Sequence, residues 1–382
     1  AVRGLSGDEN NSAGYVVNGF SAGRGYSGRR DTSNVESIEV MKGPGSALYG
    51  RSEPGGTINI ITKKPQFDRE GYIKASFGRW STTRIEGDFT NAVSDSVAFR
   101  INGAYDKSDS FRGTEPKKLA ITPSVLFAIS DRTSLLYELE YVSQEVLFDR
   151  GVVAMNGDPF TLPPERFLGD PRLGPMEIDS VGHQFTLQHE LNNDWSMLVG
   201  LGYRDSSFIG HSADTSLSGA RNLFLVDGVT VARQHRYRHY QAEDLSGRVE
   251  FTGTIDAGIT HSLLIGADAF AYEHDTYGER YRIQAGTYEY TIDAFNPDYD
   301  AWPIPDTAPQ FSRLENQDTV GIYFQDMMGL TDKLSILLGL RYDDIEQSIE
   351  NRFSGAITNV NPTELSYRAG VVFEANPNIS LY

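Results

Sequence analysis

Residues 38–65 read IEVMKGPGSALYGRSEPGGTINIITKKP, in which short apolar runs alternate with clusters of glycine and proline. Val35–Met41 and Thr57–Thr62 have the β-branched and apolar content of strands. The glycines and prolines between them are turn formers. We therefore predict short strands joined by tight turns for this part of the chain, without a long amphipathic helix.

The composition of the 382 residues excludes several classes of function. Without cysteine, the chain has no disulfide, no thiolate metal site and no cysteine nucleophile. A formal net charge of −18 argues against binding to nucleic acid, whose phosphates need clustered lysine and arginine. No run approaches the roughly 18–20 apolar residues of a membrane-spanning helix, so a closed barrel of strands is the remaining way to cross a membrane.

Charge divides the chain near Pro65. Residues 1–66 hold eight basic and six acidic residues, a net charge of +2, so the rest of the chain carries −20. From about Glu70 onward the sequence alternates between apolar and polar residues with a period of two, which is typical of strands. We therefore predict two regions with different surroundings.

The alternation separates an apolar face from a polar one. Leu135, Tyr137, Leu139 and Tyr141 fall on one face, against glutamates at 138 and 140 on the other. The same pattern recurs in residues 97–105, 319–325, 334–342 and 365–375.

The connections between these strands also alternate. Short links at 130–133, 192–194 and 331–333 alternate with long polar segments at 146–180, 206–233 and 277–312. Transmembrane barrels have short periplasmic turns, long extracellular loops and strands of roughly 9–11 residues. The pattern favours such a barrel over a soluble β-sandwich, which also alternates.

Three other features suggest chemistry but fit their surroundings poorly. Gly45–Ser52 imitates a phosphate-binding loop, but has Arg51 in place of lysine and leads into a strand. His235 and His239 lie about 13 Å apart on a strand, too far for one metal ion. Asp293, Asn296, Asp298 and Asp300 lie in a run that lacks the glycine and the terminal glutamate of an EF-hand calcium loop, and we expect a solvated acidic loop. No GxSxG or HExxH motif is present, so we expect no enzyme and no metal site.

The run from Ile38 to Pro65, with Arg3-Gly4-Leu5 and Val17-Asn18-Gly19, resembles the plug domain of TonB-dependent outer-membrane receptors, and in particular the ferric-siderophore (ferrichrome-like) branch. The resemblance implies an all-β membrane protein, in which a plug with a small mixed sheet lies inside an antiparallel transmembrane β-barrel of about 22 strands. Residues 1–66 would be the C-terminal part of the plug. Residues 67–382 would be the first 12–13 strands of a barrel that is incomplete in this chain.

The resemblance also implies roles for particular residues. The family motif would build the plug through the residues Gly43, Pro44, Tyr49, Gly50, Arg51, Pro54, Gly55 and Gly56. We expect Lys42, Arg51, Lys63 and Lys64 to face acidic residues of the barrel wall. Plug loops at 6–12 and 21–30 would meet the cargo, and the candidate ligand-binding residues in them are Arg24, Tyr26, Arg29 and Arg30, whose cations and aromatic ring suit an anionic or oxygen-rich chelate.

The function implied is active import of a ferric siderophore through the outer membrane of a Gram-negative bacterium. The partners would be the siderophore, outer-membrane lipid and a TonB-type energy-coupling protein, whose contact segment we expect to lie outside this chain. The iron would travel within the siderophore, without a cofactor held by protein side chains. Alternatives are a receptor for cobalamin, another metal complex or a glycan, a passive pore, or a barrel enzyme.

Overall fold

The computed structural model describes residues 15–21, 29–42, 56–154, 158, 160–376 and 379–381. Within them the chain forms two sheets, one of four strands and one of fifteen. The predicted motif residues Gly43, Pro44, Tyr49, Gly50, Arg51, Pro54 and Gly55 lie outside the described residues, as do Arg24 and Tyr26.

The small sheet has the strand order β2-β1-β4-β3 and comes from the N-terminal region. Its strands are β1 (Tyr15–Val17), β2 (Phe20–Ser21), β3 (Val35–Lys42) and β4 (Gly56–Thr62). β1 runs parallel to β4, whereas β1–β2 and β3–β4 are antiparallel, so the sheet is mixed, as predicted. Gly56 opens β4 at φ 144°, a backbone angle that glycine tolerates and other residues rarely adopt.

The large sheet is an antiparallel meander, which we call the wall. Neighbouring strands in space are also neighbours in sequence along its path of thirteen described strands, with β14 and β17 attached at the side. The wall strands are β5 (Glu70–Gly78), β6 (Thr82–Ser94), β7 (Val97–Lys107), β8 (Lys117–Ser130), β9 (Thr133–Val146), β10 (Met176–Glu190), β11 (Trp195–Thr215), β12 (Thr230–Asp256), β13 (Thr260–Arg282), β14 (Thr291–Asp293), β15 (Ala308–Thr331), β16 (Leu334–Asn351), β17 (Ala356–Val360), β18 (Thr363–Asn376) and β19 (Ile379–Leu381).

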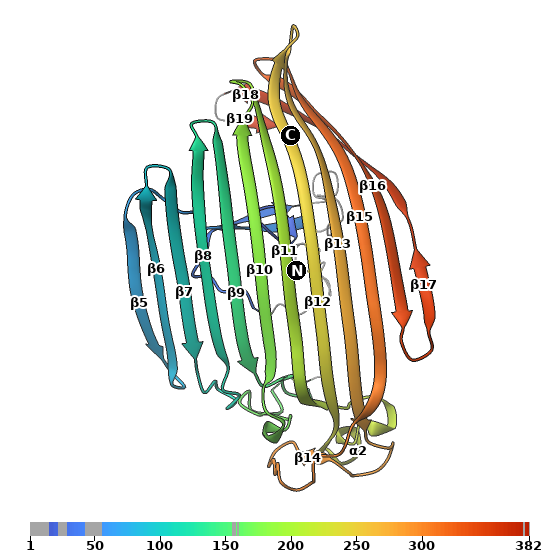
Figure 1. The fold of residues 1–382 in the computed structure, drawn as a ribbon. Coiled ribbons are helices and arrows are strands. Elements are labelled where there is room, and N and C mark those ends of the chain that lie inside the picture. The colour runs from blue at the N-terminus through green and yellow to red at the C-terminus, as the bar shows by residue number, and fades with distance from the viewer. Residues whose placement is uncertain are drawn as a thin grey trace.

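The two ends of the wall differ in their connections. The predicted short links between β8 and β9, β10 and β11, and β15 and β16 are confirmed, and they lie at one end. The long connections lie at the other end, together with β14 and the short helix α2 (Phe224–Asp227) (Figure 1). Two 3₁₀ turns, η1 (Pro171–Leu173) and η2 (Gly219–Arg221), belong to the same loops. No helix of the described residues is long and apolar enough to cross a membrane.

The wall has one apolar and one polar face, as the alternation predicts. Tyr137 pairs across the strands with Val125 and Phe185, whereas Glu138 pairs with Ser124 and Gln184. The outward positions keep large apolar side chains exposed, which suits lipid rather than water. They include Ile85, Ile101, Ile121, Phe185, Leu201, Leu245, Ile265, Ile322, Leu340 and Leu365.

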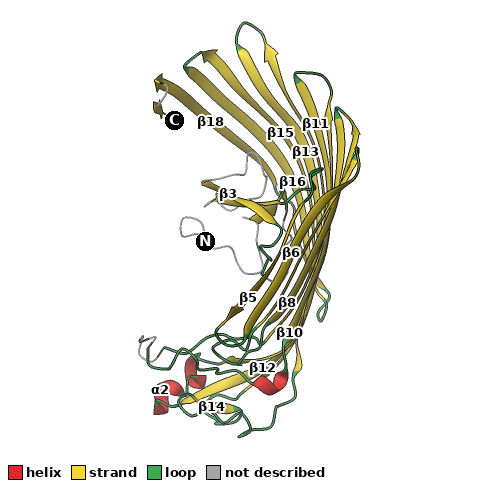
Figure 2. Cartoon of the chain, turned by 90° about the vertical axis from the view of Figure 1, so that its left-hand side faces the viewer, coloured by secondary structure: helices red, strands yellow, loops and turns green. Residues whose placement is uncertain are grey.

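The small sheet lies on the concave side of the wall. Figure 2 shows the wall edge-on as a single curved layer, with β3 on its inner side. The soluble sandwich considered above is therefore wrong, because a sandwich needs two sheets stacked face to face. The described wall is open between β5 and β19, so the barrel is not closed in this chain.

The predicted strand lengths and loop limits were wrong at the loop end. β11 spans 21 residues, β12 27, β13 23 and β15 24, about twice or more the roughly 9–11 that a bilayer requires. Residues 206–215 and 277–282 continue strands instead of opening loops. Beyond the bilayer neither face meets lipid, so the alternation that marks a membrane strand is lost there.

Candidate functional site

The small sheet and the wall meet along a polar interface that we call the seam, formed by residues 17–20, 30–31 and 62–66 against β6–β12. Lys63 Nζ lies 2.9 Å from Asp88 Oδ2, and Lys64 Nζ lies 2.7 Å from Glu138 Oε2. The prediction that these lysines face acidic wall residues is confirmed. Lys42 is exposed and makes no ion pair with a described residue, and Arg51 lies outside the described residues.

Asp31 carries the opposite charge across the same seam. Its carboxylate is buried and accepts two hydrogen bonds of 2.9 Å from the Arg84 guanidinium. Lys118 Nζ lies 2.9 Å from the same group. Burial alone would raise the pKa of Asp31, but hydrogen bonds from Arg84, Ser33 and Lys118 outweigh burial and hold that pKa well below its usual range. The carboxylate therefore stays charged and bound to the wall.

Arg29 and Arg30, two of the predicted ligand-binding residues, also lie at the seam. Arg30 Nη1 donates to Glu140 Oε2 at 3.0 Å, and the same carboxylate accepts from Arg204 Nη2 at 2.8 Å. The Arg29 side chain is exposed, while its carbonyl accepts from Gln144 Nε2 at 3.2 Å. Contact between cargo and Arg24, Tyr26, Arg29 or Arg30 stays a prediction.

A steric contact fixes the tip of the β1–β2 turn against the wall. Phe20 is buried, and the Arg248 guanidinium lies over its ring, 4.5 Å from the ring centroid. Arg248 also donates hydrogen bonds to the carbonyls of Asn18 and Gly19. A Cβ at Gly200 would stand only 2.3 Å from the Phe20 ring. The sequence analysis missed this contact, although Gly-Leu-Gly within a strand can signal a close approach by another chain segment.

The inner face of the wall next to the long loops forms a second surface, which we call the mouth. Its floor is apolar and aromatic. Phe208 lies between Phe148 and Tyr240, with ring centroids 6.3 and 5.9 Å away, and Tyr240 is followed by Phe311 at 6.1 Å. Met176 and Ile178 belong to the same buried cluster as Phe208.

Arginines surround one carboxylate beside this floor. Asp214 is buried, and its Oδ2 lies 2.9 Å from Arg238, 3.4 Å from Arg236 and 3.5 Å from Arg150. The Arg238 and Arg150 guanidinium groups lie over the Phe148 ring at 4.7 and 4.9 Å. Cations next to flat aromatic rings suit a ligand that carries both anionic oxygens and apolar or unsaturated groups.

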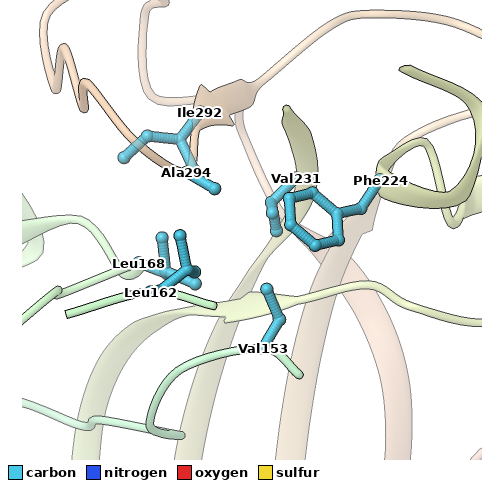
Figure 3. Close-up of a cluster of buried hydrophobic side chains, with 7 residues drawn as sticks. All are labelled: Val153, Leu162, Leu168, Phe224, Val231, Ile292 and Ala294. Carbon is cyan, nitrogen blue, oxygen red and sulfur yellow. The ribbon is translucent and has the colours of Figure 1, made fainter. Parts of the chain in front are cut away.

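The long loops pack against one another through a small core of their own (Figure 3). It joins loops that are far apart in the sequence, and its buried members are Val153, Leu162, Leu168, Phe224, Val231, Ile292 and Ala294. Because these side chains pack together, the long loops form one ordered unit at the mouth, which we call the cap.

A buried polar cluster supports this cap. Tyr290 donates from its hydroxyl to Asp170 Oδ2 at 3.1 Å, and Arg172 Nη2 lies 2.7 Å from the same oxygen. The Arg233 guanidinium lies over the Tyr290 ring at 4.4 Å. Burial would raise the pKa of Asp170, but Arg172 and Arg233 outweigh it and lower that pKa. Burial, reinforced by Asp170, raises the pKa of Tyr290.

The histidines and acidic residues considered in the sequence analysis make hydrogen bonds within the fold or face solvent. His235 is hydrogen-bonded to His211 and to the Pro305 carbonyl, and His239 is exposed on the same strand. Asp293 accepts from the backbone amides of Phe295 and Asn296 in a turn. Within the described ranges no group of three or more histidine or acidic residues is placed to hold a metal ion.

Comparisons with known families match most of the chain. Residues 1–57 match the family described as TonB-dependent Receptor Plug Domain, and residues 121–382 match the family described as TonB dependent receptor-like, beta-barrel.

Individual relatives agree with these matches. The metal-pseudopaline receptor CntO of Pseudomonas aeruginosa is 32% identical over 95% of this chain and 51% of its own length. The ferrioxamine B receptor of Salmonella typhimurium is 27% identical over 91% of this chain and 49% of its own. The chain thus spans about half the length of these curated relatives.

Solved structures show the same fold. The siderophore receptor PiuA from Acinetobacter baumannii superposes with a TM-score of 0.84 at 19% identity, covering 95% of this chain and 55% of that one. The ferric-catecholate import receptor Fiu from Escherichia coli, in its open form, gives 0.80 at 18% identity, covering 96% and 61%.

Proposed function

Because the chain belongs to the TonB-dependent receptor family of Gram-negative outer-membrane β-barrel proteins, we propose that the protein imports a ferric siderophore across the outer membrane. Import is active, with energy delivered by a TonB-type coupling protein. Iron enters as part of the cargo, and no cofactor is held by side chains. The apolar outer face of the wall contacts outer-membrane lipid.

The observation that carries this proposal is the seam. The small sheet is bound to the inner face of the wall by partly buried ion pairs, among them Lys63–Asp88, Arg84–Asp31 and Arg30–Glu140. A passive pore needs a lumen open to water, whereas here ion pairs hold a domain inside it. Breaking several such pairs at once requires work, which favours an energy-coupled transporter over a pore.

The same arrangement suggests a separate role for each of the two regions of the chain. We propose that residues 1–66 act as the C-terminal part of the plug and residues 67–382 as the first part of the barrel. Support comes from the two family matches and from the sheets, since β4 ends at Thr62 and β5 begins at Glu70.

The cargo is proposed from the mouth and from the relatives. Arginines beside an aromatic floor suit an iron chelate, and several relatives are receptors named for ferrioxamine, ferrichrome or pyoverdine. A second candidate is a chelate of another metal, because the relative that is 32% identical is named as a metal-pseudopaline receptor. Neither cargo needs a covalent step, so the protein acts as a transporter and not as an enzyme.

Uptake of radiolabelled iron tests this function. Cells that lack their other siderophore receptors would express the full-length gene product and receive siderophores loaded with ⁵⁵Fe. We expect accumulation that stops when a protonophore removes the proton-motive force. Accumulation that persists without that force would show a passive pore. Nickel or cobalt chelates in place of iron would identify the second candidate.

A further inference from the structure

The arginines of the mouth are placed against one another by the strand register. Arg236 on β12 stands directly opposite Arg280 on β13, and the next inward-facing pair towards the loops is Gln234 with Arg282. Like charges in directly opposed positions of a sheet destabilise it. A net charge of −18 makes a cluster of arginines here more notable, since most of the chain favours carboxylates.

The carboxylates near this cluster are too few to balance it. Asp214 is shared by Arg150, Arg236 and Arg238. Among the described residues, no carboxylate lies within ion-pair distance of Arg280, and the nearby Arg282 donates to the Ser218 hydroxyl at 2.8 Å. Arg236 Nε lies 3.4 Å from Asp214 Oδ2 without the geometry of a hydrogen bond. One carboxylate shared by three guanidinium groups, beside Arg280 with no carboxylate in reach, leaves an excess of positive charge that indicates a missing anion.

The cluster is open to a ligand. The Arg150 side chain is 47% exposed and the Arg236 side chain 26% exposed, so both guanidinium groups can be reached from the lumen. Arg238 is buried, but its guanidinium borders the aromatic floor through Phe148. An anion that approached from the loop side would meet several guanidinium groups at once, and each can form two parallel bonds to a carboxylate.

We propose that the mouth selects metal chelates that are net negative and rich in carboxylates, and that Arg236 and Arg280 determine this selection. The inference rests on the proposed function, because it specifies the class of cargo. A neutral or cationic trihydroxamate chelate would leave the arginine charges unmatched while removing their water, which opposes binding. A carboxylate chelate supplies the missing acceptors and relieves the repulsion between Arg236 and Arg280.

Binding to de-energised cells separates this proposal from transport. Cells that express the full-length protein would be chilled, treated with a protonophore and given ⁵⁵Fe complexed with citrate, with EDTA or with ferrioxamine B. We expect binding of at least one carboxylate complex above the receptor-free strain, and weaker binding of ferrioxamine B. R236Q and R280Q should each weaken carboxylate binding by about tenfold or more, because each removes a charge-assisted bond.

Two further variants control for structure. R236K keeps the charge and should retain more binding than R236Q, while R132Q, at an exposed turn on the opposite end of the wall, should leave binding unchanged. Heat-modifiable migration on gels would show that each variant still forms a folded barrel. Binding of ferrioxamine B that equals or exceeds carboxylate binding would overturn the proposal, as would carboxylate binding that is absent or insensitive to R236Q and R280Q. Uptake that is independent of energy would instead contradict the proposed function alone.

Discussion

The seam and the mouth both contain arginines beside carboxylates, but in different proportions. At the seam and its flanking wall positions, seven cations (Arg30, Lys63, Lys64, Arg84, Arg100, Lys118 and Arg204) meet six carboxylates (Asp31, Glu86, Asp88, Asp106, Glu138 and Glu140). At the mouth, the arginines at 150, 236 and 238 share Asp214, and the arginines at 280 and 282 have no carboxylate partner among the described residues. Balanced charges hold two parts of one molecule together, whereas unbalanced charges leave capacity for a ligand.

The largest effect should come from removing one carboxylate of the balanced set. In the full-length protein, Glu140→Gln would leave the buried Arg204 and the partly buried Arg30 without their common partner. Breaking a buried pair in this way costs about 3 kcal/mol or more. Urea unfolding in detergent, followed by circular dichroism, would measure the loss of stability.

Glu177→Gln is the matched control, because Glu177 is exposed on β10. We expect a change within about 0.5 kcal/mol for this variant. Equal effects of the two substitutions would mean that the seam gains nothing from the charge of Glu140. The contrast between seam and mouth would then lose its physical basis.

A smaller effect should follow from crowding the seam sterically. Gly200→Ala would place a Cβ 2.3 Å from the Phe20 ring, and overpacking of this kind costs about 1–3 kcal/mol. The displaced ring should loosen the small sheet, and susceptibility to a large antibiotic that the outer membrane normally excludes would report the leak.

Relief by a second substitution would identify the cause. Adding Phe20→Ala to Gly200→Ala removes the clash and should recover part of the lost stability. Gly247→Ala on the neighbouring strand is the control, because its Cβ would meet Leu201 at an ordinary 3.5 Å. If the double variant were as unstable as the sum of the two single ones, Phe20 would not be the group that Gly200 accommodates.

Much of this architecture could be predicted from the sequence, because lipid imposes a simple rule on the wall. Outward positions such as Leu139 must be apolar and inward ones such as Glu138 need not be, so the alternation reveals both strand and face. The same rule fails beyond the bilayer, where residues 206–215 continue β11 with polar residues on both faces. Strand ends in that zone therefore could not be predicted.

The pairings within the site were less predictable. The charge contrast between residues 1–66 and the rest indicated that Lys63 and Lys64 face acidic residues, but not that their partners are Asp88 and Glu138. Arg236 and Arg280 are 44 positions apart in the sequence, and only the register of β12 and β13 brings them opposite one another. A shift of one residue would turn one of them to the outer face.

The cap offers a smaller test of how far buried polar groups matter away from the seam. Tyr290→Phe would remove only the hydroxyl that donates to Asp170, while the ring under Arg233 stays. We expect a loss of about 1 kcal/mol in the local stability of residues 283–307, measured as faster backbone hydrogen exchange. Tyr288→Phe, at an exposed position of the same loop, should leave exchange unchanged. Equal exchange in both variants would show that the hydroxyl does not hold the loop.

The smallest effect should be that of mild acid on the cap. Asp170 has a lowered pKa in the folded protein. Its ion pairs therefore stabilise the cap fully at pH values above about 3.9, the pKa of an aspartate in the unfolded chain. This contribution is lost only as the pH falls towards the pKa of the folded state. Hydrogen exchange of residues 288–293, a stretch without the Pro305 carbonyl that is hydrogen-bonded to His235, should therefore stay constant between pH 7 and about pH 5 after correction for its intrinsic pH dependence. Exchange that accelerates within this window would mean that the Arg172 and Arg233 pairs do not keep Asp170 charged. The cap would then resemble the mouth, with its charges unmatched, more than the balanced seam.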